Sequence, residues 1–299
     1  EIVRRSIDAR KKPELFSVYL LRLCLPKEER FRKLPNVTLD TRQPYVLPLR
    51  GEARLVSRPV IIGTGPAGLF AGLMLAEAGY QPILLERGLP AAARKEAVDA
   101  FWAGAPLNPD CNVSFGEGGA GTFSDGKLNT LVKDNAGRNR KVLELFCRFG
   151  ADSSILYEQK PHVGTDRLIS IVTAMREEIL RLGGEVRFSS RAVDFRVEED
   201  RLKAVLVEKA DGTRYELKTE VLIAATGHSA RDTFRVLASR GFSMEAKAFA
   251  VGFRVQHRQK DISLSQYGER EADFLPPAPY KLAAKTSVGR GVYSFCMCP

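Results

Sequence analysis

The sequence predicts an α/β fold, and three observations lead to this prediction. A strand, a glycine-rich turn, a helix and a second strand follow one another from residue 59. Further apolar strands come later, separated by helices and a hairpin, and the first 55 residues differ in composition from the rest. A chain of 299 residues can form more than one domain. We therefore predict a small N-terminal α+β domain at 1–55, an α/β domain at 56–240 and the start of a β-rich domain at 241–299.

The N-terminal segment is basic and contains several prolines. Residues 1–55 hold thirteen Lys and Arg against seven Asp and Glu, and the whole chain has a net charge of +10. Residues 2–10 predict a short charged helix, and residues 16–25, rich in β-formers, predict a strand. Pro35, Pro44 and Pro48 lead to a linker near 48–57. A basic surface can meet nucleic acid, but it is more often a solvated face, and no nucleic-acid-binding motif accompanies it here.

Residues 59–86 predict a βαβ unit. Apolar residues at 60–62 and 82–85 have the character of short buried strands. Between them, residues 66–79 carry apolar side chains at helical spacing and end at Gly79, a residue typical of helix C-termini.

The rest of the chain mixes helices and strands. Helices are predicted at about 137–149 and 166–182, the second with an apolar face formed by Leu168, Ile171, Val172, Met175, Ile179 and Leu182. Residues 186–188 begin a strand, residues 192–220 predict antiparallel strands, and residues 221–227 predict a buried strand that ends in a glycine turn. Alternating apolar residues at 249–255 indicate a strand of a mixed or antiparallel sheet.

Composition restricts the class of protein. No apolar run reaches the roughly 18 residues that a membrane-spanning helix requires, so we expect no membrane association. The five cysteines are odd in number and mostly scattered, which indicates a reducing, cytoplasmic setting. Neither they nor the three histidines have the spacing of a zinc site, so we expect no bound metal.

The strongest motif is the glycine pattern of residues 63–68, Gly-Thr-Gly-Pro-Ala-Gly. Alone it is weak evidence, but here it follows a predicted strand and opens a predicted helix. Gly63 permits the tight turn, Gly65 lets the backbone approach a pyrophosphate, and Gly68 lets helix and strand pack closely. The helix N-terminus then offers N–H groups to the phosphates. This context predicts a dinucleotide-binding, Rossmann-type fold.

Glu86 closes the second strand of this unit. A carboxylate at that place can accept hydrogen bonds from the ribose hydroxyls of an adenosine. It also repels a 2′-phosphate, so the sequence argues against NADP at this site. Replacing Gly65 by a bulky residue or Glu86 by Lys is therefore predicted to abolish dinucleotide binding without unfolding the chain.

Later features favour FAD over NAD as the dinucleotide. The chain after the βαβ unit does not continue as a simple alternation of strands and helices. A predicted β-meander at 192–220 interrupts the fold where flavoproteins commonly carry one, and Ala225-Thr226-Gly227 ends an apolar strand as it does near the FAD of two-dinucleotide-fold flavoproteins.

Four stretches resemble a bacterial family of FAD-dependent, or NAD(FAD)-utilizing, dehydrogenases, which are two-dinucleotide-fold flavoproteins. They are residues 4–12 (RRSIDARKK), 116–130 (GEGGAGTFSDGKLNT), 160–166 (KPHVGTD) and 289–299 (GRGVYSFCMCP). The resemblance implies a Rossmann-type FAD-binding domain with an inserted β-rich substrate or cap domain. Members of this family continue past the Cys-Met-Cys-Pro stretch, which implies that this chain is truncated at its C-terminus.

The predicted cofactor-binding residues lie in the glycine turn, at the end of the second strand, in the glycine loop (residues 116–127) and around the late strands. They are Gly63, Thr64, Gly65, Pro66, Ala67, Gly68, Glu86, Arg87, Gly118, Gly119, Gly121, Thr122, Ser124, Lys127, Val193, Ala225, Thr226 and Gly227. Three residues are weak candidates for catalysis. Lys127 could stabilise negative charge on a reduced flavin, His162 could donate a proton, and Cys296 could exchange electrons, although each has an ordinary structural explanation.

These features predict an FAD-dependent oxidoreductase, a dehydrogenase or reductase that passes hydride or electrons to an unidentified small-molecule substrate or acceptor. NAD(P)H can serve only as a transient donor, because no second glycine motif exists to hold it. Two alternatives stay open. One is a non-catalytic FAD-binding scaffold or sensor, and the other is a flavin-dependent RNA-modifying enzyme that docks through its basic N-terminal domain.

Overall fold

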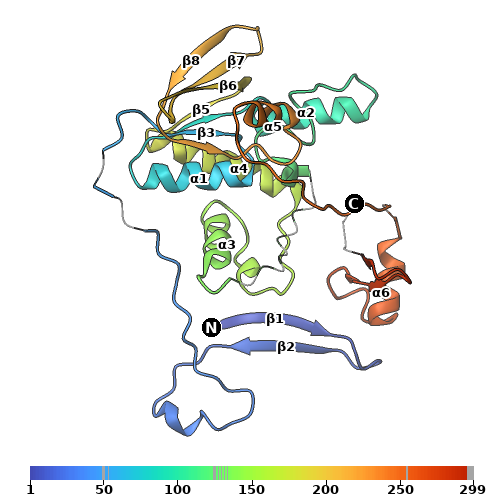
Figure 1. Ribbon diagram of the computed structural model, residues 1–299. Helices are drawn as coiled ribbons and strands as arrows, with labels where there is room; N and C mark the ends of the chain where they lie inside the picture. The colour runs from blue at the N-terminus through green and yellow to red at the C-terminus, as the bar shows by residue number, and fades with distance from the viewer. Residues whose placement is uncertain are drawn as a thin grey trace. The chain divides into compact units, whose positions relative to one another are not determined.

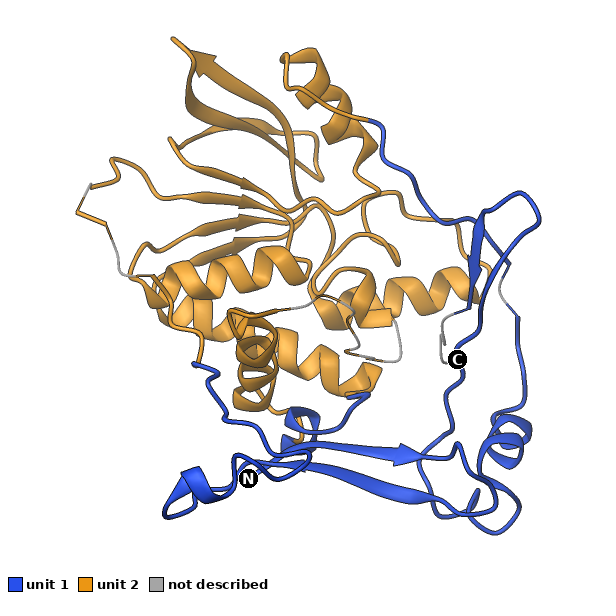
Figure 2. Ribbon diagram, turned by 60° about the horizontal axis from the view of Figure 1, so that its bottom comes forward, with its two compact units in different colours: residues 1–43, 153–161, 246–299 blue, residues 44–152, 162–245 orange. Residues whose placement is uncertain are grey.

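The structure is a computed structural model of a mixed α/β protein. It describes residues 1–48, 51–52, 54–123, 126, 128, 130, 132, 134–253 and 255–294. These residues form two units, one of residues 44–152 and 162–245 and one of residues 1–43, 153–161 and 246–299 (Figure 2). The predictions made for Ser124, Lys127 and Cys296 lie outside the described residues.

A four-stranded parallel sheet lies at the centre of the larger unit. Its spatial order is β5 (Glu185–Arg187), β4 (Ile83–Leu85), β3 (Val60–Ile62) and β9 (Leu222–Ala224). The helices α1 (Pro66–Glu77) and α4 (Thr165–Arg181) cover one face of this sheet (Figure 1). The βαβ unit predicted for residues 59–86 is confirmed. The strand predicted before the Ala-Thr-Gly turn is also present, but it is not buried as predicted, because Leu222 and Ile223 are half-buried and Ala224 is exposed.

The other face of the sheet carries an antiparallel meander of β6 (Ser190–Glu198), β7 (Arg201–Lys209) and β8 (Arg214–Lys218). Val60, Ile62, Ile83 and Leu85 form one core with Phe195 and its neighbours in the meander. Ile61 and Leu84 are also fully buried. Because β3 and β4 are covered on both faces, their sequences are continuously apolar rather than alternating.

Three more helices complete this unit. The predicted helix near 137–149 is confirmed as α3 (Arg138–Arg148), and the apolar residues predicted for α4 are buried, with Leu182 half-buried just beyond its end. The sequence missed α2 (Ala91–Trp102) and α5 (Arg231–Ser239). Helix α5 has only nine residues, and α2 buries an arginine on its inner face, which obscures an apolar pattern.

The smaller unit contains two hairpins and short helices. They are β1 (Ile2–Asp8), β2 (Phe16–Leu21), η1 (Glu28–Arg30), η3 (Ser153–Leu156), α6 (Gln259–Tyr267), β10 (Ala283–Lys285) and β11 (Gly291–Tyr293). The strand predicted at 16–25 is confirmed for residues 16–21, and it pairs with β1 in antiparallel register.

The helix predicted at 2–10 is wrong, because residues 2–8 form β1. Strand β2 pairs with one edge of β1, and the distant segment 153–161 binds the backbone of Arg5. Arg5 N–H donates to the carbonyl of Tyr157 (2.7 Å), Gln159 N–H donates to the carbonyl of Arg5 (3.0 Å), and Arg5 pairs with Glu158. A charged segment with weak local preference becomes a strand when partners on both sides satisfy its backbone.

The strand predicted at 249–255 is also wrong for the described residues of that stretch. Residues 249–253 and 255 form no strand, and Phe249 and Phe253 are 84% and 99% exposed. A period-two pattern gives a strand only where another strand accepts its hydrogen bonds. Within the described residues, no helix combines the length and apolar character needed to cross a bilayer.

Candidate dinucleotide site

A cavity of about 620 Å³ opens at the carboxyl ends of β3, β4 and β9 in the larger unit. This is the edge of a parallel sheet at which ligands bind in open α/β folds. The cavity wall combines the turn after β3, the end of β4, the glycine loop, the start of β6 and the segment after β9. The lining residues are Ile62, Gly63, Gly65, Pro66, Ala67, Leu85, Glu86, Arg87, Ser114, Phe115, Gly116, Gly119, Ala120, Gly121, Ser190, Arg191, Ala192, Ala224, Ala225, Thr226, Gly227, His228, Ser229 and Phe234.

Most of the predicted cofactor-binding residues meet in this cavity. Those that line it are Gly63, Gly65, Pro66, Ala67, Glu86, Arg87, Gly119, Gly121, Ala225, Thr226 and Gly227. They come from four segments that are far apart in the sequence, so the fold brings together what the motifs indicated separately. Their role in binding a cofactor stays a prediction.

Five predicted cofactor-binding residues, and the catalytic candidate His162, are not among the residues that line the cavity. Thr64 is fully buried, and its carbonyl accepts a hydrogen bond from the N–H of Gly118 (2.9 Å), which joins the two glycine segments. Gly68 lies inside α1, Thr122 is buried, and Val193 lies at an irregularity of β6. His162 is exposed and is not among the lining residues.

The three motif glycines have different structural roles. Gly63 has φ +98°, and a Cβ there would lie 2.4 Å from the carbonyl oxygen of Ala225. At Gly68 a Cβ would lie 1.9 Å from the carbonyl oxygen of Gly63. Gly65 differs, because its φ is −67° and the nearest atom to a Cβ would be Cα of Gly119 at 3.7 Å. The fold requires glycine at 63 and 68, whereas at 65 the missing side chain leaves room in the cavity.

Helix α1 presents its N-terminus to this space. Gly65 is the N-cap residue, no side chain caps the helix, and Pro66 and Ala67, its first residues, line the cavity. The first N–H groups of a helix have no partner within the helix and carry its positive dipole end. This end of the cavity is therefore suited to an anion such as a pyrophosphate.

Glu86 is buried, and its carboxylate accepts four hydrogen bonds from the protein itself. Oε2 accepts from the N–H (2.9 Å) and hydroxyl (2.8 Å) of Thr64, and Oε1 accepts from the N–H of Gly88 (2.9 Å) and Gly116 (3.0 Å). Glu86 therefore ties the turn after β3 to the glycine loop. The sequence predicted a ribose-binding role and gave no sign of this second one.

Arg94, which the sequence analysis missed, fixes the shape of the glycine loop. This α2 residue is fully buried, and burial lowers the pKa of its guanidinium to about 10, so it stays charged at neutral pH. The guanidinium donates only to backbone carbonyls and lies 4.7 Å from the ring centroid of Phe123. Its acceptors are Glu117 (2.7 Å), Gly119 (2.8 Å), Asn112 (3.0 Å), Val113 (3.0 Å) and Gly116 (3.3 Å).

Glu117 is the second buried charge of this loop. Its Oε2 accepts from the N–H of Ala91 (2.7 Å), at the start of α2, and from Arg176 on α4 (3.3 Å). Its Oε1 has no hydrogen-bond partner among the described residues. Burial raises the pKa of this carboxyl group, against the opposing effects of its hydrogen bond and of Arg176.

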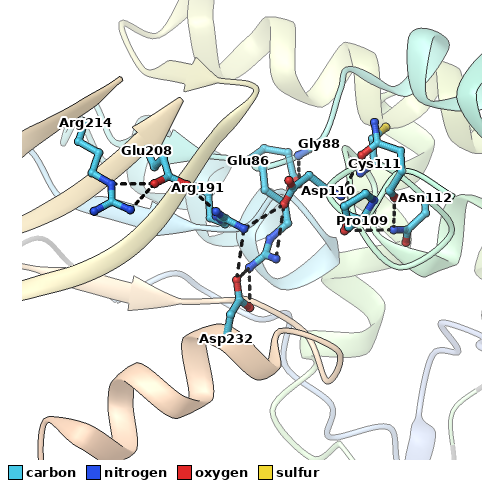
Figure 3. A network of polar contacts seen from close by, with 12 residues as sticks. Glu86, Gly88, Pro109, Asp110, Cys111, Asn112, Arg191, Glu208, Arg214 and Asp232 are labelled. Atoms are coloured by element: carbon cyan, nitrogen blue, oxygen red, sulfur yellow. Dashed lines mark hydrogen bonds and ion pairs between the residues drawn. The ribbon is translucent and has the colours of Figure 1, made fainter. Parts of the chain in front are cut away.

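A cluster of charged side chains lies beside Glu86 (Figure 3). Arg87 hydrogen-bonds to Asp232 (3.0 Å) and lies 3.8 Å from Asp110, while Arg191 contacts Glu208 and lies 3.6 Å from Asp110. Burial raises the pKa of Asp232, but the hydrogen bond and charge of Arg87 outweigh it, so the net shift is downward. Neither here nor in any other part of the chain that the structure describes is a group of His, Cys, Asp and Glu side chains arranged to hold a metal ion.

Comparisons with known proteins agree with this picture in part. Residues 248–299 match the family described as FAD-dependent protein, C-terminal domain-like. The chain is 42% identical over 304 residues to an uncharacterized protein of Clostridium beijerinckii, an alignment that covers 100% of this chain and 56% of that protein. The chain therefore spans a little over half the length of this relative.

Several solved structures share weaker similarity. THI4 from Thermovibrio ammonificans is 17% identical, with a TM-score of 0.43, over 63% of this chain and 64% of its own. BexE, studied for oxidation during BE-7585A biosynthesis, is 19% identical, with a TM-score of 0.41, over 79% and 42%. PieE, a flavin-dependent monooxygenase solved with FAD and substrate, is 19% identical, with a TM-score of 0.33, over 62% and 32%.

Proposed function

We propose that this chain binds FAD in the cavity at the carboxyl edge of its parallel sheet and belongs to an FAD-dependent oxidoreductase. The observation that carries the proposal is Gly65, which lines the cavity in front of an uncapped helix N-terminus and where a Cβ would make only an ordinary contact, 3.7 Å from Cα of Gly119. The match of residues 248–299 to a family described as FAD-dependent supports FAD among the dinucleotides. In this proposal the substrate is a small molecule, and NAD(P)H is a transient electron donor.

The described residues fit FAD in size and in chemistry. A volume of about 620 Å³ lies within the roughly 300–1,000 Å³ of typical cofactor sites. The N–H groups at the start of α1 can bind the pyrophosphate, and Gly65 permits the close approach that this requires. FAD, when bound, supplies the redox chemistry.

The remaining walls of the cavity hold and shield the cofactor. Arg94 and Glu117 fix the backbone of the glycine loop and of the residues just before it, so residues 114–116 and 119–121 line the cavity in a set conformation. Residues 224–229, at the end of β9 and directly after it, also line the cavity. Preorganised walls of this kind lower the entropic cost of binding.

The test is the visible absorption spectrum of the purified protein before and after anaerobic addition of NADH or NADPH. A flavin spectrum that bleaches is the expected result. Flavin that stays oxidised would favour another donor, or the scaffold alternative. Protein that is colourless and cannot be reconstituted with FAD would contradict the proposal.

A further inference from the structure

Two arginines lie on the cavity wall next to the predicted ribose-binding residue. Arg87 directly follows Glu86 at the end of β4, Arg191 belongs to β6, and both line the cavity. In dinucleotide folds, an arginine near this acidic position is the group that accommodates a 2′-phosphate. By position alone, Arg87 and Arg191 would favour a 2′-phosphorylated adenosine, which is the opposite of what Glu86 predicts.

Both arginines already form ion pairs with carboxylates. The Arg87 guanidinium donates to Asp232 (3.0 Å), lies 3.8 Å from Asp110 and stacks 4.3 Å from the ring centroid of Phe115. Arg191 lies 3.6 Å from Asp110 and 4.0 Å from Asp232 and also contacts Glu208, as the dashed lines in Figure 3 show. Arg214 also pairs with Glu208, so three cations face three carboxylates, and the cluster has no net positive charge to offer a phosphate.

We infer that Asp110 and Asp232 determine specificity at the adenosine end of the cavity, because they neutralise Arg87 and Arg191 and so exclude adenosine nucleotides with a 2′-phosphate. A 2′-phosphate would have to displace these carboxylates while lying close to Glu86. A free 2′-hydroxyl makes no such demand. The inference rests on the proposed function, since it requires adenosine to bind beside Glu86.

The test compares two nucleotides that differ only in the 2′-phosphate, 5′-AMP and adenosine 2′,5′-bisphosphate. In the double variant Asp110→Asn/Asp232→Asn, Arg87 loses both of its carboxylate partners, while Arg191 keeps Glu208. Calorimetric titration should show the affinity ratio shifting toward the bisphosphate by about tenfold or more, because a freed guanidinium binds phosphate strongly. Adding Arg87→Met to the double variant should reverse the shift.

Asp194→Asn is the matched control. Asp194 pairs with Arg240 beyond the other end of α5 and is not among the lining residues, so its loss removes an ion pair without freeing Arg87. The control should bind 5′-AMP and adenosine 2′,5′-bisphosphate with the same affinity ratio as wild type. If the cofactor-free double variant kept the wild-type ratio and still bound FAD in a separate titration, the inference alone would be overturned. If wild-type protein bound neither nucleotide and no FAD, the proposed function would fail and the inference with it.

Discussion

Gly65 and Glu86 lie on the same cavity wall but have different roles. A Cβ at Gly65 would make one ordinary contact, with Cα of Gly119 at 3.7 Å, whereas Glu86 holds Thr64, Gly88 and Gly116 by four hydrogen bonds. A lysine at 86 would place a cation among these N–H donors in a buried position and destabilise the fold. Glu86→Lys is therefore expected to destabilise the chain as well as the site, and Gly65 is the residue that tests binding alone.

Gly65→Val should remove FAD binding and leave the fold intact. The added side chain occupies the space that the pyrophosphate needs, and valine adopts the extended backbone of this position without strain. We expect FAD affinity to fall by tenfold or more and the free energy of unfolding to change by less than about 1 kcal/mol. Flavin absorbance after reconstitution and urea unfolding without cofactor measure the two effects.

Gly68→Ala provides the contrast for Gly65→Val. Its Cβ would overlap the carbonyl oxygen of Gly63, so this small substitution should destabilise the cofactor-free chain more than the larger one at 65. Wild-type flavin content in Gly65→Val would contradict the assignment of the site.

At the scale of elements, α2 positions the glycine loop through one buried side chain. Arg94→Met should therefore loosen residues 112–119, because five backbone carbonyls lose their donor. We expect a loss of about 2–4 kcal/mol in the free energy of unfolding and weaker FAD binding. Lys95→Met is the control on the same helix, since Lys95 only pairs with Asp99 on the surface. Equal stability of Arg94→Met and the control would show that the loop does not depend on Arg94.

Glu117 joins the start of α2 to the loop and to α4, and it should make stability depend on pH. Its pKa in the folded chain is raised above the ordinary 4.5, so the folded chain keeps a proton that the unfolded chain releases. This contribution is complete below pH 4.5 and is lost as the pH rises through the raised pKa. The free energy of unfolding of Glu117→Gln, minus that of wild type, should increase from pH 4.5 upward and then level off. A difference that stays constant with pH would refute the prediction.

At the scale of the whole molecule, the exposed apolar side chains near 249–255 are expected to promote association between copies of the protein and to add little to the free energy of unfolding. Phe249 and Phe253 have almost fully exposed side chains, and large exposed apolar groups promote contact between molecules. Phe249→Ser/Phe253→Ser should reduce self-association in analytical ultracentrifugation and change the free energy of unfolding by less than about 0.5 kcal/mol. A substantial loss of stability would instead mean that these rings pack within the folded chain.

The sequence by itself determined several local elements of the larger unit. Continuous apolar runs at β3 and β4, helical spacing in α1 and α4, and the positive φ at Gly63 are set over a few residues, so their patterns can be read directly. It also marked nearly half of the residues that line the cavity, because the motif and the Ala225-Thr226-Gly227 turn directly follow strands of one parallel sheet.

Tertiary structure decided the features that depend on distant partners. Residues 2–8 form a strand because they pair with β2 and, at Arg5, with segment 153–161. Arg94 is buried because the loop carbonyls accept its hydrogen bonds there. The pairing of Arg87 and Arg191 with Asp110 and Asp232 likewise needs four separate segments to meet. Such contacts leave no periodic trace in the sequence, since burial and charge pairing are set by residues that only the fold brings within reach.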